Sequence, residues 1–212
     1  MPRSSLLPMD ASRDEPKPIG PWARTALTLL LVPLAWHAFH DEYGYVPLLS
    51  DIDLAIHEFG HMLFMPFGIQ FLGNTMVILG GSLTQVAFPL IFVVYFLRRR
   101  DGVRDVHAAM VCLWWTSINL LSVAIYCGDS RAGVLMLITG QTGQESDAHD
   151  WNNLLSRWHV LNKDTLYAGR MRGVAWTLCV ASILIGIVAA WNPELFGRSA
   201  ARAVEDEAAE SA

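Results

Sequence analysis

The sequence predicts an all-α fold: a polytopic membrane bundle of about four to five spans, with an interfacial amphipathic helix and a small re-entrant hairpin. Hydrophobic residues make up 53% of the 212 residues and charged residues only 17%, a composition typical of membrane proteins. Residues 173–191 carry no charged side chain, and about 20 apolar residues suffice for a helix to cross a bilayer. The net charge of −5 gives no reason to expect a nucleic-acid partner.

Polar segments flank one long apolar region. Residues 1–21 are polar and rich in proline, and they predict a mobile tail without a signal-peptide cleavage site. Residues 198–212 form an acidic tail rich in alanine and glutamate. The region 22–197 is expected to form a single membrane-embedded domain, whose core covers residues 52–130.

Apolar runs and turn-forming residues set the expected elements within this region. Helices are expected over residues 25–39, 51–65, 80–97, 108–127 and 173–191, with the amphipathic helix beginning near residue 150. Gly73-Asn74 lies between two short apolar runs and predicts a hairpin over residues 69–79. The three cysteines all fall in apolar segments, which argues against a disulfide framework.

The most specific chemical signal is the motif His57-Glu58-Phe59-Gly60-His61 in an apolar helix. Histidines four residues apart lie on one helix face, where both imidazoles can bind one metal ion. Glu58 then lies close enough to accept a proton from a water molecule activated by that metal. Isolated histidines on apolar helices are usually packed or hydrogen-bonded. Three ionisable side chains within five residues of an apolar segment are costly, however, and they favour a metal site.

A second group of polar residues closes the first predicted span, where His37 and His40 are followed by Asp41 and Glu42. One interpretation of these four residues is a second metal cluster. We favour a span end that reaches interfacial water, because ionisable residues are common there. Another interpretation is a membrane di-iron oxygenase that uses the histidines at positions 37, 40, 57, 61 and 149, since imidazole also binds iron.

The order of these features resembles the site-2 protease family of intramembrane zinc metalloproteases. His57-Glu58-Phe59-Gly60-His61 is similar to the first family motif, and residues 80–85 (GGSLTQ) to its glycine-containing second motif. Asn119-Leu120-Leu121, followed by Asp129, is similar to the third motif, whose aspartate completes the zinc site. The resemblance covers roughly residues 52–130 and implies a divergent, metalloprotease-like domain.

The chain departs from the family pattern around the third ligand. No proline separates Asn119 from Asp129, and Ser130 stands where the family has glycine. The expected metal ligands are therefore His57, His61 and Asp129, with Asp150 or His149 as alternatives for the third position. Asp129 is preferred because it closes a span, whereas Asp150 begins a helix expected at the surface.

The resemblance implies a membrane-embedded zinc metallopeptidase that cleaves a transmembrane protein substrate in or near the bilayer. Glu58 would act as the general base, and Asn119 or Gln85 would stabilise the oxyanion. The alternative is a non-proteolytic, metal-binding membrane protein with a structural or partner-binding role. We expect a multi-pass protein of the bacterial inner (plasma) membrane.

Overall fold

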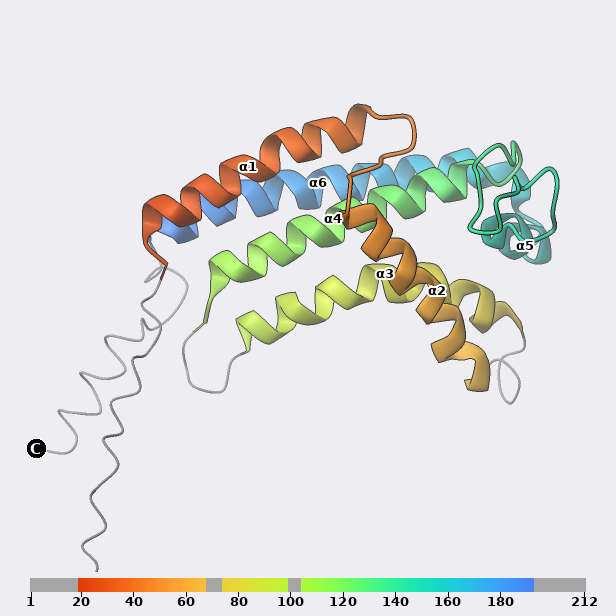
Figure 1. Ribbon diagram of the computed structural model, residues 1–212, viewed down its shortest axis with the longest axis horizontal. Helices are drawn as coiled ribbons and strands as arrows, with labels where there is room; N and C mark the ends of the chain where they lie inside the picture. The colour runs from red at the N-terminus through yellow and green to blue at the C-terminus, as the bar shows by residue number, and fades with distance from the viewer. Residues whose placement is uncertain (1–18, 68–73, 99–103, 193–212) are drawn as a thin grey trace, which may run out of the picture.

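The computed structural model describes residues 19–67, 74–98 and 104–192, and over these residues the protein is helical, as predicted (Figure 1). The helices are α1 (Pro21–His40), α2 (Leu49–Phe67), α3 (Asn74–Leu97), α4 (Val106–Gly128), α5 (Asp150–Arg157) and α6 (Asp164–Trp191), with a short 3₁₀ helix η2 (Leu161–Lys163) before α6. The described segments contain no β-strand. Met136 and Thr142 form an isolated antiparallel bridge.

Three stretches of the described chain are long and apolar enough to cross a membrane. They are α3, α4 and the stretch Leu161–Trp191, which includes α6. The apolar side chains on their outer faces are strongly exposed, among them Ile91 (63%) and Leu184 (59%). Such a surface suits lipid and identifies a membrane protein. The expected count of four to five spans is not confirmed.

The core lies where α4 packs along α6, and the two helices run in opposite directions (Figure 1). Helix α1 covers both of them. The main apolar cluster joins these three helices and includes Leu31 and Phe39 of α1, Trp114 and Leu121 of α4, and Cys179 of α6. Cys179, like the other two cysteines, is a free thiol.

Helix α2 crosses α3 at close range (Figure 1). Gly60 of α2 and Gly80 of α3 meet there, and a Cβ atom on either glycine would clash with the backbone of the other. Small residues allow such close approach between helices. This contact brings the histidine face of α2 against α3 and so places the site.

The predicted hairpin over residues 69–79 is wrong in its second half. Residues 74–79 form the first turns of α3. The sequence predicted that this helix would begin at Gly80. Residues 69–73 lie outside the described residues, as do 1–18 and 193–212, which contain most of the two tails. The glycine pair at 80–81 does not end a helix, because packing against α2 offsets the low helix propensity of glycine.

Candidate metal centre

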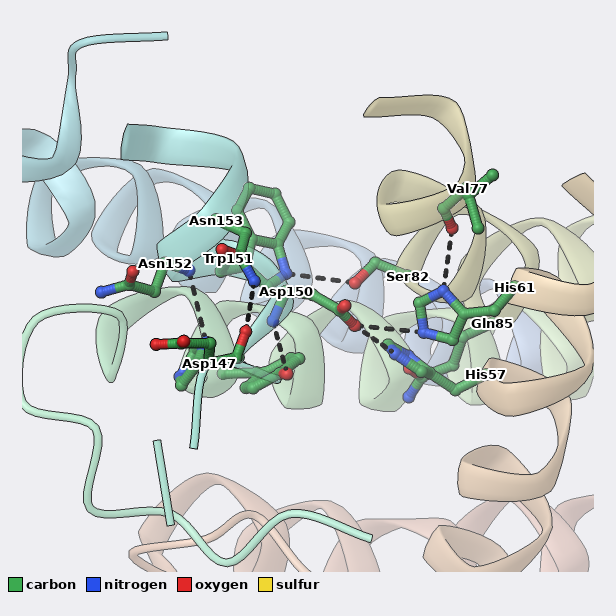
Figure 2. Close-up of polar contacts among 12 residues, drawn as sticks. His57, His61, Val77, Ser82, Gln85, Asp147, Asp150, Trp151, Asn152 and Asn153 are labelled. Atoms are coloured by element: carbon green, nitrogen blue, oxygen red, sulfur yellow. Dashed lines mark hydrogen bonds and ion pairs between the residues drawn. The ribbon is translucent and has the colours of Figure 1, made fainter. Parts of the chain in front are cut away.

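The two histidines of α2 point toward α3, and each is held by a carbonyl oxygen of that helix (Figure 2). His61 Nδ1–H donates to the backbone oxygen of Val77 at 2.8 Å. His57 Nδ1–H donates to Oε1 of Gln85 at 2.9 Å. A backbone carbonyl can only accept, so the proton of a neutral His61 ring is on Nδ1 and its Nε2 carries a lone pair. This outer support of imidazoles is typical of metal ligands.

The carboxylate of Asp150, the first residue of α5, meets both free ring nitrogens (Figure 2). Its Oδ2 lies 3.2 Å from His57 Nε2 and 3.1 Å from His61 Nε2. The three side chains form a group whose ligand atoms all lie within 4.8 Å of one another. A tetrahedral ion with bonds of about 2.0–2.1 Å holds its ligands about 3.3 Å apart, so this spacing fits zinc.

The electrostatics of the group require a positive charge. Two ring nitrogens with lone pairs and one carboxylate oxygen would repel one another without a proton or a cation between them. Burial alone would raise the pKa of Asp150. Hydrogen bonds and charge attraction from His57 and His61, which arise when a proton is on the facing ring nitrogens, together outweigh burial and hold that pKa below the ordinary value. Asp150 is therefore ionised, as a metal ligand must be.

Gly81 of α3 leaves room beside the two ring nitrogens. A Cβ atom at this position would lie 2.5 Å from His57 Nε2 and 2.6 Å from His61 Nε2. Two imidazoles and one carboxylate form the ligand set of many catalytic zinc sites. The donor set fits a zinc ion with one position left for water, and a side chain at position 81 would crowd that ion.

Glu58 lines a cavity of about 810 Å³ next to the three ligands. The cavity also reaches Tyr126 of α4 and the segment 135–139, which follows α4. No group in the described parts of the chain forms a hydrogen bond with the Glu58 carboxylate, which is half-buried. Glu58 is therefore available to a water molecule or a substrate in the cavity.

Asp129, the preferred third ligand, is bound elsewhere. Its Oδ1 accepts the N–H of Val134 and its Oδ2 the N–H of Leu135, both at 3.0 Å. His149 Nε2–H also donates to Oδ2, at 3.3 Å. Asp129 thus caps α4 and anchors the following loop, and His149 is its partner and no ligand. The carboxylate at the histidines is that of Asp150, the alternative considered from the sequence.

Asn119, the predicted oxyanion donor, does not line the cavity. Its side-chain nitrogen donates to Asp53 Oδ1 at 3.1 Å, and the residue is fully buried. Trp115 Nε1–H donates to the same carboxylate oxygen at 2.8 Å. Asn119 therefore links α4 to α2 within the core, and this prediction is corrected. The other candidate, Gln85, is at the site and orients His57.

The histidines of α1 lie apart from the candidate centre. His40 Nδ1–H donates to the backbone oxygen of Trp36 and its ring stacks on that indole. His37 is exposed in the last turn of the same helix. The metal-binding group found among the described residues comprises His57, His61 and Asp150. The five histidines of the di-iron interpretation are thus not brought together.

Two contributors to the site were missed in the sequence. Val77 acts through its backbone, which no side-chain pattern reveals. Tyr126 was treated as part of a span, yet it lies beside His57.

Comparison of the chain with protein-family models, with curated proteins and with solved structures gives no match.

Proposed function

We propose that this protein is a membrane-embedded zinc metallopeptidase that hydrolyses peptide bonds of membrane-protein substrates. The observation that carries the proposal is the convergence of His57, His61 and Asp150, with their metal-facing atoms freed by outer hydrogen bonds, beside a cavity that contains Glu58. Zinc would act there as a Lewis acid and would lower the pKa of a water molecule.

The remaining chemistry belongs to residues of the chain. Glu58 would take the proton of the attacking water and then deliver it to the leaving amine, the usual role of the glutamate in this motif. Asp150 would offset one unit of the ion's charge, while the imidazoles stay neutral. The cavity would hold the substrate, since apolar residues such as Leu54, Val123 and Leu135 line much of it. We place the protein, as a multi-pass chain, in a bacterial inner membrane.

The test begins with purified protein in detergent or nanodiscs. We expect one zinc ion per chain by mass spectrometry of metals, and cleavage of a model transmembrane substrate that a chelator stops and zinc restores. Glu58→Gln should keep the zinc and lower the cleavage rate about 10²–10⁴-fold, the usual contribution of a general base. Glu42→Gln makes the same change in an exposed loop residue outside this cavity and should leave the rate unchanged.

Two outcomes would overturn the proposal. If the purified protein does not bind zinc stoichiometrically, the proposed zinc centre is refuted. Zinc binding combined with cleavage that is indifferent to Glu58→Gln, or with no cleavage of any membrane substrate, would favour the non-proteolytic metal-binding role.

A further inference from the structure

The position of Tyr126 on α4 is fixed by aromatic contacts on two sides. Its ring stacks on His149, with centroids 4.4 Å apart and an angle of 27°. It meets the ring of His57 edge-on, with centroids 6.0 Å apart. The same residue lines the cavity together with Glu58. The phenol is thus placed within the group of residues that would act on a substrate.

The hydroxyl group of Tyr126 is held as an acceptor and keeps its proton free. The backbone N–H of Asp150 donates to Tyr126 Oη at 3.0 Å. A phenol has one proton to donate, and no acceptor within the described segments takes it. Accepting one hydrogen bond polarises the O–H bond and makes it a stronger donor. The available direction for this proton is the cavity.

A peptidase of this kind needs a donor at the carbonyl oxygen of the scissile bond, where negative charge develops. Asn119 is committed to Asp53. Gln85 accepts from His57 through Oε1, and its amide nitrogen is the rival donor at the cavity. We infer that Tyr126 is a further catalytic residue, whose hydroxyl group donates a hydrogen bond to that oxygen. This inference rests on the proposed function.

The arrangement also gives the hydroxyl group a second use that does not require catalysis. By accepting the Asp150 N–H it fixes the first residue of α5, and thereby the third ligand. A residue that only positions Asp150 would affect zinc binding and leave the rate per zinc-loaded molecule intact. The two roles therefore separate in measurements of metal binding and of kcat.

The experiment compares Tyr126→Phe with the wild type and with Tyr95→Phe, which makes the same change on an exposed residue of α3. At saturating zinc we expect Tyr126→Phe to lower kcat about 100-fold, with a small change in KM, as loss of an oxyanion donor does. The second readout is binding of a phosphinic peptide, whose tetrahedral anionic group mimics the transition state. Its Kd should rise about 100-fold. Tyr95→Phe should change neither quantity.

A second variant covers the case in which Tyr126→Phe does not fold. Incorporation of 3,5-difluorotyrosine at position 126 keeps the hydroxyl group but makes it more acidic. Because an ionised phenol cannot donate, the alkaline limb of the pH profile of kcat should move to lower pH.

Unchanged kcat and phosphinate affinity in Tyr126→Phe would overturn the inference, as would an unmoved alkaline limb in the fluorinated protein. A variant whose only defect is weaker zinc binding, with full kcat at saturating zinc, would assign Tyr126 to positioning alone. In both cases the wild type and Glu58→Gln still test the proposed function separately. If the wild-type protein neither binds zinc nor cleaves a substrate, both the proposed function and the catalytic role of Tyr126 are refuted.

Discussion

At the scale of single residues, the site depends on the lack of a side chain at Gly81 as much as on the ligands themselves. Gly81 faces the two ring nitrogens that would bind the ion, and the nearest approach of an added Cβ atom to them would be 2.5 Å. That separation is shorter than van der Waals contact, and the rings cannot withdraw easily because their Nδ1 atoms are hydrogen-bonded to α3.

Gly81→Ala should therefore weaken zinc binding. We expect the affinity to fall about 100-fold or more, since supporting groups of metal sites alone are worth 10–100-fold. The control is Gly173→Ala in α6, where an added Cβ atom meets nothing within 4 Å. It should keep the zinc and gain up to about 1 kcal/mol of stability. Competition with a fluorescent zinc chelator measures both. Equal affinities in the two variants would contradict the placement of the ion beside Gly81.

The two aspartates give a second prediction at this scale. Asp150→Asn should abolish stoichiometric zinc binding, because the amide cannot replace the charge of the carboxylate. Asp129→Asn should retain zinc and lower stability by about 1–3 kcal/mol, since its oxygens accept the N–H groups of Val134 and Leu135. Metal content and thermal unfolding distinguish them. Loss of zinc only in Asp129→Asn would restore the ligand first expected from the sequence.

These residues show which parts of the site the sequence could predict. His57, Glu58 and His61 lie within one helical turn, so their shared face follows from helix geometry alone. Asp150 is 93 residues from His57, and only the packing of α5 brings it there. Asn119 matched a family pattern, but its amide donates to the buried carboxylate of Asp53. A sequence pattern does not show that this carboxylate needs hydrogen-bond donors.

At the scale of elements, α5 depends on tertiary contacts for its stability. It has eight residues, fewer than an isolated helix needs to be stable in water. Contacts with other elements hold it: Trp151 Nε1–H donates to Ser82 of α3, and Asn152 donates to the backbone of Ser130. Its own Leu154 and Leu155 are buried against the rest of the protein. Because its first residue is Asp150, every one of these contacts also positions the metal ligand.

The cap of α5 predicts a pH dependence. His149 Nδ1 accepts the N–H of Asn152, so capping requires an unprotonated Nδ1. Burial lowers the pKa of His149, and Asp129 and Asp150 only partly oppose it. The unfolded chain gains a proton near pH 6.5, and the folded protein gains it only at lower pH. The stabilisation is therefore complete above about pH 6.5 and is lost as the pH falls below it.

Hydrogen exchange in metal-free protein tests this dependence. Between about pH 7.5 and about pH 5.5, the amides of α5 should lose protection, after correction for intrinsic rates. His149→Asn keeps a capping side chain and removes the titration. Its loss of protection should be smaller than that of the wild type. The difference between the two proteins excludes the nearby carboxylates, which both contain. An identical pH response in both proteins would assign the effect to another group.

At the scale of the whole molecule, the helical class was predictable because apolar runs of this length suit helices in a membrane. The arrangement of the helices was not, since it depends on contacts such as Gly60 against Gly80. In Figure 1, α5 lies at one end of the bundle, and the last turn of α3 and the first turn of α4 lie at the other end. The centre lies near the α5 end, because Val77 is the fourth residue of α3 and Tyr126 the third from last of α4.

This arrangement predicts how the protein sits in its membrane. Residues 98–104, between α3 and α4, include four arginines. Short, positively charged connections stay on the cytoplasmic side, so the metal centre should open toward the opposite face. Cysteine labelling with a membrane-impermeant maleimide tests this in spheroplasts. Thr139→Cys, in a loop residue that lines the cavity, should react in intact spheroplasts, and Arg104→Cys only after permeabilisation. The reverse pattern would place the centre at the cytoplasmic face, because both residues lie outside the helices at opposite ends of the same span, α4.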